Sequence, residues 1–481
     1  MKKNRYHSYL YYWLIALLLF QVSCKSLDED PQSFVSPQSF GNSTSQIEAA
    51  YAASLNYLWR YWGGYGYGYG PFRHDDQLAG GNLNIGLDNG DGLWRMHYGA
   101  LHNINNAIAS IKAGNVKGAT DEAKDLLLAQ GLFLRAHNYF MLVRMFGGVP
   151  LITDETPDPI ANPLPRSSIA DVYNLIVSDL IFASSKLPES WTGEPGKPTK
   201  GAAQGILAKV YLTMATYPLN ESSNYQKAAD VALQVIESGN YSLVPGITDV
   251  FKLENKYGPE MMWSYNSTYD DIATDPQIWA PSVYADGGWG DAAIDTTFEH
   301  GWPDQVRKDA YLLLEWEGVP YTDFAEQTPF CKKFFFYLSE DDFNGYSSTM
   351  NWPVIRYADV LLIYAEAANM ANGGPTDKAV DAINQVIDRA NNYEENPLHP
   401  KLSTAMSQAD FDAAVIQERS WELVFENADR WFDICRKRIL DQVTARPDYL
   451  ANFSEDDYLF PIPEIDLNLN ELLEQNPGYS N

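Results

Sequence analysis

The sequence predicts a mainly α-helical protein in which paired helices form a scaffold and an irregular, loop-rich lobe is set upon it. Two observations lead to this prediction. Apolar residues recur at helical spacing in one segment after another. Between these segments lie two long regions, residues 59–95 and 266–305, that are rich in glycine, proline and aromatic residues and lack that spacing. Loops of such length inside a compact protein are usually functional.

The N-terminal segment has the composition of a secretory signal. A basic start at Lys2 and Lys3 is followed by an apolar run from Trp13 to Phe20, and a small residue precedes Cys24. The alternative is a membrane anchor, but the run is shorter than the roughly 20 apolar residues that a span needs. A cysteine directly after the cleavage point indicates a bacterial lipoprotein. We therefore expect a signal peptide over residues 1–23 and a lipidated acidic tether over residues 24–40.

The clearest helix is expected from about Asp121 to Phe146. Thr120 can cap its first turn, and Gly147 and Pro150 follow its end. Six further helices are expected, over residues 168–187, 202–215, 225–238, 356–371, 376–391 and 407–427.

Small residues alternate with large apolar ones in the helices expected over residues 202–215 and 225–238. That alternation allows two helices to approach closely, as in tetratricopeptide repeats. We expect three regions after the tether: an N-terminal helical region over residues 41–215, a helix pair with a loop-rich insert over residues 216–330, and a C-terminal helical region over residues 331–481.

The charge and cysteine content exclude several classes of protein. The net charge is -29 and becomes three units more negative without residues 1–23, which argues against nucleic-acid binding and against a basic membrane-binding patch. Cys331 and Cys435, the cysteines other than Cys24, fit neither a disulfide framework nor a C-x-x-C metal site, and we expect buried thiols. The segment from Asp88 to Gly92 lacks the calcium-loop pattern, so we expect a turn there, with no metal and no cofactor.

Charged residues form a regular pattern in the C-terminal third of the chain. Glu418, Glu422 and Glu426 are four residues apart and would share one helical face. Arg419, Arg430 and Arg436 are close enough in sequence to pair with such acids. We interpret the set as a structural network of ion pairs and not as a catalytic group.

Several separated motifs carry a resemblance to a known family. They are Phe133-Leu-Arg-Ala-His-Asn-Tyr-Phe140, Phe146-Gly-Gly-Val-Pro-Leu151, Lys197-Pro-Thr-Lys-Gly-Ala-Ala203, Arg356-Tyr-Ala-Asp359, Arg430-Trp-Phe-Asp433 and Tyr458-Leu-Phe-Pro-Ile-Pro463. In this order, from Cys24 to Tyr479, they resemble the SusD/RagB family of outer-membrane lipoproteins.

The resemblance implies a cell-surface lipoprotein of the outer membrane, held by lipid at Cys24, that is not an enzyme. Such a protein captures an oligosaccharide, or a peptide in RagB-like members, and delivers it to a partner SusC-like TonB-dependent transporter, for which it acts as a lid. The acidic residues after Cys24 suit surface export in that family. No nucleic acid is expected as a partner.

The family has no fixed ligand motif, so candidate ligand residues come from composition. Sugar rings are recognised by flat aromatic side chains together with polar groups. One candidate is the segment in which Trp62, Tyr65, Tyr67 and Tyr69 alternate with glycines, followed by Arg73, Asp75 and Asp76; a packed or transporter-facing loop is the alternative. The second candidate comprises Trp279, Tyr284 and Trp289, the last flanked by glycines. Trp94, Trp302 and Trp352 are expected to be structural.

Two other classes of function remain open at this point. A secreted glycoside hydrolase would need two carboxylates that flank a cleft, and no motif isolates such a pair among the acidic residues. A tetratricopeptide adaptor would bind a protein partner alone. The aromatic segments favour a small polar ligand over an adaptor.

Overall fold

The computed structural model describes residues 41–59, 62, 75–79, 87–268, 276–283, 287–339, 342–344, 347–395, 397–443 and 454–479. The predicted signal, Cys24 and the tether lie outside this range. So do Tyr65, Tyr67, Tyr69, Arg73 and Tyr284.

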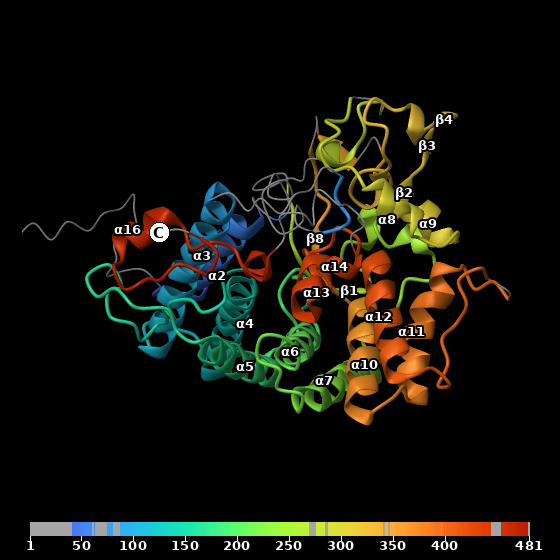
Figure 1. The fold of residues 1–481 in the computed structure, drawn as a ribbon. Coiled ribbons are helices and arrows are strands. Elements are labelled where there is room, and N and C mark those ends of the chain that lie inside the picture. The colour runs from blue at the N-terminus through green and yellow to red at the C-terminus, as the bar shows by residue number, and fades with distance from the viewer. Residues whose placement is uncertain are drawn as a thin grey trace, which may run out of the picture.

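The scaffold is a row of long helices in which each packs against its neighbour along the row. In Figure 1 the row runs as an arc beneath the lobe, from α3 at one end to α11 and α12 at the other. Its members are α2 (Thr44–Trp59), α3 (Leu87–Lys112), α4 (Asp121–Phe146), α5 (Ile169–Lys186), α6 (Lys200–Met214), α7 (Asn224–Ser238), α10 (Tyr357–Asn372), α11 (Asp377–Ala390) and α12 (Gln408–Glu422).

Helix α4 is the central core helix and has the bounds that the sequence predicts. The Thr120 side chain accepts a hydrogen bond from the Ala123 backbone N–H, and Gly147 caps the other end with a positive φ of 72°. From Leu127 onward nearly all of its side chains are buried. It is the one helix in the described ranges that is long and apolar enough to cross a membrane, and it is enclosed by other helices.

The other predicted helices are confirmed, with small shifts at their ends. Helices α6 and α7 pack against each other as a hairpin, as the alternation of small and large residues predicts. The small residues serve close contact: a Cβ on Gly205 would lie 2.8 Å from the Ile355 side chain. Ser168, Thr199, Thr376 and Ser407 cap the helices that follow them.

The structure corrects three expectations. Residues 87–95 are not a loop, because α3 begins at Leu87. For the same reason the segment from Asp88 to Gly92 is the start of a helix and not a turn. Helix α12 ends at Glu422, short of the predicted end, because Phe425, Asn427 and Ala428 adopt positive φ angles that a right-handed helix cannot contain.

The lobe consists of short strands and short helices between α7 and α10, and it lies at the upper right of Figure 1. Its base is the antiparallel pair β1 (Met261–Tyr265) and β8 (Trp352–Arg356). Two-residue strands form the other pairs: β2 (Leu312–Leu313) with β5 (Phe330–Cys331), β3 (Glu315–Trp316) with β4 (Val319–Pro320), and β6 (Phe343–Asn344) with β7 (Ser347–Ser348). Helices α8 (Thr296–His300) and α9 (Val306–Tyr311) lie among them, with 3-10 turns at Ile247–Asp249, Leu253–Asn255, Pro276–Trp279, Tyr321–Asp323 and Lys332–Phe334.

The C-terminal segment returns along the scaffold. It contains α13 (Asp429–Lys437), α14 (Leu440–Val443), a 3-10 turn at Glu455–Tyr458 and α16 (Glu464–Leu469). The Phe460 backbone N–H donates to the Met145 carbonyl oxygen over 2.7 Å, which joins this segment to the end of α4. Helix α16 lies near α3, as Figure 1 shows.

A cluster of buried charges, here called the junction cluster, fastens the lobe to the scaffold. Its carboxylates are Glu260, Glu418, Glu422 and Glu426, and its cations are Arg307, Lys333, Arg356 and Arg389. Arg307 Nη1 of α9 lies 2.6 Å from Glu418, and Arg389 Nη2 of α11 lies 2.7 Å from Glu422. The prediction of a structural ion-pair network is confirmed, although Glu426 lies beyond the end of α12 and reaches the cluster from the following turn.

Arg419, Arg430 and Arg436 are likewise paired. Arg419 lies 2.7 Å from both Asp359 and Asp433, and Arg436 bonds to Glu366. Cys331 is buried as predicted, whereas Cys435 is partly exposed.

Candidate functional site

Trp289 is the most open tryptophan in the described part of the chain. Its side chain is 43% exposed, and the other described tryptophans are buried or half-buried. Exposed Ser282, Val283 and Asp291 lie in the same two segments of the lobe. An exposed indole in the same segments as the polar side chains of Ser282 and Asp291 offers an aromatic surface together with hydrogen-bonding groups, which is the composition that sugar recognition requires.

Backbone hydrogen bonds fix the segment that carries Trp289. Its own N–H donates to the Gln277 carbonyl oxygen over 2.8 Å, and the Gly290 N–H donates to the Ala280 carbonyl oxygen over 3.0 Å. A Cβ on Gly288 would lie only 2.2 Å from the Ala280 carbonyl oxygen, so this close approach requires glycine. The indole is therefore presented from a defined backbone even though it belongs to an irregular region.

The carboxylate of Glu326 supports the same segment from beneath. It accepts a hydrogen bond from the Ser282 backbone N–H over 3.2 Å, and Gly290 passes directly over it with a φ of 72°. Sequence reasoning did not select Glu326, because it lies far along the chain in a stretch without an aromatic pattern. The glycines on both sides of Trp289 are the sequence signal that another part of the chain lies close to the backbone at this point.

The structure brings together the two segments that composition selects separately. Leu78, after the tyrosine–glycine segment, forms a β-bridge with Ile294, shortly after Trp289. The Ala79 N–H donates to the Ala293 carbonyl oxygen over 2.9 Å, and the Asp295 N–H donates to the Gln77 carbonyl oxygen over 2.7 Å. The end of the first candidate segment and the end of the second thus share one short ladder.

Buried polar groups anchor the segment that contains Asp75 and Asp76. The guanidinium of Arg430 pairs with Asp76 at 2.6 Å, and Gln77 Nε2 donates to the Ser420 carbonyl oxygen over 2.8 Å. Asp75 is buried and accepts from the Gln77 backbone N–H over 2.8 Å. Burial and the neighbouring Asp76 raise the pKa of Asp75 to about 8. Both carboxylates are buried and bonded within the protein, so neither is exposed for contact with a ligand.

Two of the candidate tryptophans are core residues. Trp62 is fully buried, with its ring centroid 6.2 Å from that of His97. Trp279 is 2% exposed and packs against Phe334, Trp352 and Phe425 at centroid distances of 4.9, 5.3 and 5.6 Å. Both are therefore structural residues and not ligand platforms, because Trp279 fills the interior of the lobe with other aromatic rings and Trp62 packs against α3.

The three tryptophans expected to be structural are buried. Trp94 lies 4.8 Å from Tyr98 and 5.1 Å from Phe146 between ring centroids. Trp302 stacks on Trp421, and Trp352 stacks on Phe334. Of the candidate ligand residues within the described ranges, Trp289 is thus the one that meets solvent.

Two family models match the chain. One is described as the SusD family and matches residues 264–479; the other is described as starch-binding and associating with the outer membrane, and matches residues 76–212. SusD-like protein P2 of Formosa agariphila is 30% identical over 97% of this chain and 98% of its own length.

Solved structures share the fold. A SusD homolog from Bacteroides thetaiotaomicron superposes with a TM-score of 0.80 at 23% identity, covering 92% of this chain and 98% of the homolog. Surface glycan-binding protein A from Bacteroides uniformis gives a TM-score of 0.75 at 21% identity, with coverage of 90% and 99%.

Proposed function

This chain belongs to the SusD family, and from that premise we propose that it is a cell-surface protein of the outer membrane that captures an oligosaccharide. The relative named for glycan binding and the family description that mentions starch support a carbohydrate ligand. Binding, and not turnover, is the proposed activity.

The observation that carries the proposal is the open indole of Trp289 on a fixed backbone. A sugar ring can stack its C–H face on the indole, and the polar side chains of the same segments can meet its hydroxyl rim. Because the backbone on both sides of Trp289 is already hydrogen-bonded, little ordering remains to oppose binding.

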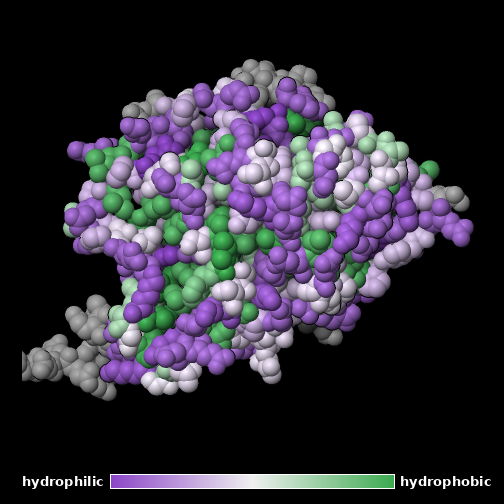
Figure 2. Space-filling model, turned by 90° about the horizontal axis from the view of Figure 1, so that it is seen from below, coloured by the Kyte–Doolittle hydropathy of each residue, from purple (hydrophilic) through white to green (hydrophobic). Residues whose placement is uncertain are grey.

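We further propose that the captured glycan passes to a SusC-like TonB-dependent transporter, with this protein as its lid, and that a lipid on Cys24 holds it at the membrane. The surface of the molecule is suited to an aqueous setting. Figure 2 shows a face that is largely polar, with apolar side chains gathered in patches between the polar ones. Replacing Cys24 with alanine should release the protein from the membrane and impair glycan uptake, while the purified protein should still bind its glycan.

The direct test is a glycan array followed by calorimetry on the wild type and on Trp289→Ala. Loss of a stacking platform should weaken glycan binding by about fivefold or more, since one aromatic stack contributes about 1–3 kcal/mol in comparable ring-stacking sites. Tyr393→Ala is the matched control, because Tyr393 is an exposed aromatic residue in the turn after α11, 56% accessible, and outside the lobe.

Three results would contradict the proposal. One is unchanged glycan affinity in Trp289→Ala, and another is an equal loss in Tyr393→Ala. The third is release of shorter sugars from any glycan that binds, which would indicate a hydrolase. Binding of peptides with no binding of any glycan would instead support the RagB-like alternative.

A further inference from the structure

With one exception, the buried arginine and lysine side chains of the described residues each pair with a carboxylate. Ten arginine and lysine side chains are buried in the described part of the chain. Nine of them pair with a carboxylate: Arg135, Lys209, Arg307, Lys333, Arg356, Arg389, Arg419, Arg430 and Arg436. Arg144, near the end of α4, forms no ion pair with a described residue. A buried charge without a partner is costly, so this arginine requires an explanation.

The contacts of Arg144 hold its guanidinium in place but leave its Nη1 group available to donate a hydrogen bond. Its Nε donates to the Phe140 carbonyl oxygen over 3.2 Å, and its Nη2 lies 2.7 Å from Met141 Sδ. The group is clamped between the rings of Phe140 and Phe432, at 3.9 and 3.7 Å. Nη1 makes no hydrogen bond with a described residue, and burial lowers the pKa of Arg144 to about 10.

Nearby acids attract Arg144 without pairing with it. Asp429 and Asp433 both favour its charged form. Asp429 is bonded to Lys209, and Asp433 is bonded to Arg419 and Arg436. Their charge is therefore already shared with other cations, and Arg144 remains charged at neutral pH with an open donor edge.

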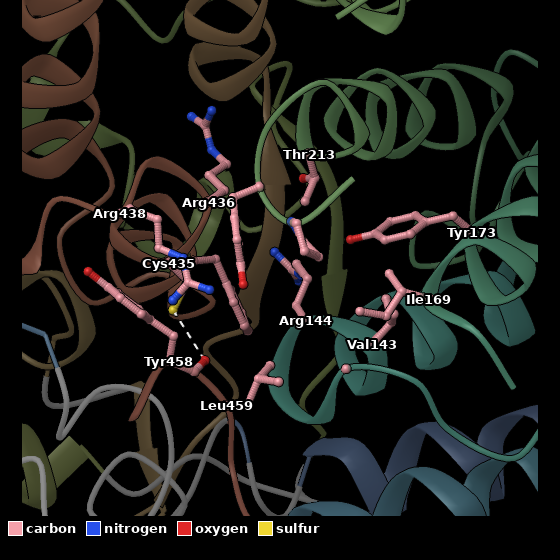
Figure 3. Close-up of a pocket in the computed structure, with 14 residues that line it drawn as sticks. Val143, Arg144, Ile169, Tyr173, Thr213, Cys435, Arg436, Arg438, Tyr458 and Leu459 are labelled. Atoms are coloured by element: carbon pink, nitrogen blue, oxygen red, sulfur yellow. Dashed lines mark hydrogen bonds between the residues drawn. The ribbon is translucent and has the colours of Figure 1, made fainter. Parts of the chain in front are cut away.

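That open edge faces a cavity of about 100 Å³ between α4, α5, α13 and the C-terminal segment. Its apolar lining comes from Val143, Ile169, Phe432 and Leu459. Figure 3 shows Arg144 and Tyr173 directing their polar ends toward the same space from α4 and α5.

Tyr173 supplies a second open donor. Its side chain is 2% exposed, and its hydroxyl makes no hydrogen bond with a described residue. Burial raises the pKa of Tyr173, so the hydroxyl keeps its proton at any physiological pH. Across the cavity, Arg438 is held over the rings of Tyr217 and Tyr458, at 3.5 and 4.0 Å, with Glu455 as its ion-pair partner.

We propose that this cavity binds a small organic carboxylate with an apolar or aromatic body. Arg144 Nη1 and the Tyr173 hydroxyl would donate to the carboxylate, and the apolar lining would receive the body of the ligand. One unpaired cation calls for a single negative charge, and mostly apolar walls disfavour a fully hydrated inorganic anion. The site is separate from the Trp289 surface and does not depend on the glycan proposal.

The test uses benzoate as the probe and benzamide, which has the same shape without the charge, as its control. Benzoate should bind the full-length protein saturably in calorimetry and raise its melting temperature, while benzamide should bind at least about tenfold more weakly. Arg144→Met should weaken benzoate binding by about tenfold or more, because a charge-assisted hydrogen bond is lost. Tyr173→Phe, which removes only the hydroxyl, should weaken it about threefold to tenfold.

Two exposed positions provide matched controls, Arg95→Met and Tyr57→Phe, and neither should change benzoate binding. Tyr173→Phe keeps the test valid if Arg144→Met does not fold. The proposal is overturned if benzoate does not saturate, if benzamide or sulfate binds equally well, or if both cavity variants bind benzoate like the wild type. Glycan binding should be unchanged in Tyr173→Phe, which separates this site from the Trp289 surface.

Discussion

The helical scaffold and the loop-rich lobe are stabilised in different ways. In the scaffold, α4, α5, α6, α11 and α12 begin at side-chain caps, and each helix packs against its neighbour along the row. In the lobe, most strands are two residues long, and the fixed points are side chains and backbone groups from distant parts of the chain.

This difference indicates which substitutions should leave the stability of the protein nearly unchanged and which should lower it strongly. Scaffold helices lose stability in small increments, because each cap or close contact contributes a small part of the total. The junction cluster, which joins the lobe to scaffold helices α11 and α12, depends on buried charges that act together, so one change there has a large effect.

The largest effect is expected from Glu422→Gln. Glu422 bonds to Arg307, Arg356 and Arg389, so its neutralisation leaves the four buried cations of the junction cluster facing three carboxylates. The free energy of unfolding in urea should fall by about 3–5 kcal/mol, as for other broken buried ion pairs.

Glu237→Gln is the control for this measurement. It makes the same chemical change in an exposed pair with Lys378, where the loss should be below about 1 kcal/mol. Equal losses in the two variants would remove the distinction between the junction cluster and surface pairs.

The second effect is acid sensitivity. Burial alone would raise the pKa of Glu422, but Arg389 and Arg356 lower it well below its ordinary value, and Arg436 does the same for Glu366. The stability from these pairs is therefore complete above the ordinary glutamate pKa and is lost as the pH falls through the folded-state pKa values.

Each such group should cost about 1.4 kcal/mol of stability per pH unit below about pH 4.5. Urea midpoints measured from about pH 6 to about pH 3 test this, and the slope should be shallower in Glu422→Gln. A flat profile in the wild type would show that the junction cluster is not maintained by its charges.

A third, smaller effect is expected within the scaffold from Gly131→Ala. The new Cβ would lie 2.3 Å from the Tyr51 hydroxyl, which donates to the Leu127 carbonyl oxygen. We expect a loss of about 1–3 kcal/mol despite the better helix propensity of alanine. Gly374→Ala, where a Cβ meets no atom within 4 Å, should be neutral, and thermal unfolding compares the two.

The smallest effect is expected from Thr120→Ala. It removes the side-chain cap of α4, which bonds to the Ala123 N–H over 3.1 Å, and should cost about 1 kcal/mol. A loss as large as that of Glu422→Gln would mean that scaffold and lobe do not differ in cooperativity. The measurement is again urea unfolding, with Ser184→Ala on the exposed face of α5 as the control.

The scaffold helices could largely be predicted, because the residues that set the ends of each helix lie close to it in the sequence. The bounds of α4 follow from Thr120, the apolar spacing and Gly147, and all three signals lie within one short stretch. The start of α3 was missed because glycines at positions 90, 92 and 99 interrupt its pattern, and only packing against α2 and α4 compensates for them. The early end of α12 depends on left-handed residues that the sequence does not mark with glycine.

The candidate site was predictable only in part, because burial in the lobe is decided by distant residues. Composition identified Trp289, whose flanking glycines keep its backbone close to a neighbour. The same reasoning selected Trp279, which Phe334, Trp352 and Phe425 enclose. Arg144 looks like any other arginine in the sequence, and its missing partner is visible only in three dimensions.

The ladder at Leu78 and Ile294 has a consequence for the order in which the chain folds. Asp76 pairs with Arg430, 354 positions later, so the segment before Leu78 cannot be fixed until most of the C-terminal third has been synthesised. Contacts so far apart in sequence form late and slowly. Residues 75–79 should therefore be among the last to become protected from hydrogen exchange during refolding, and fragments that end before Arg430 should never protect them.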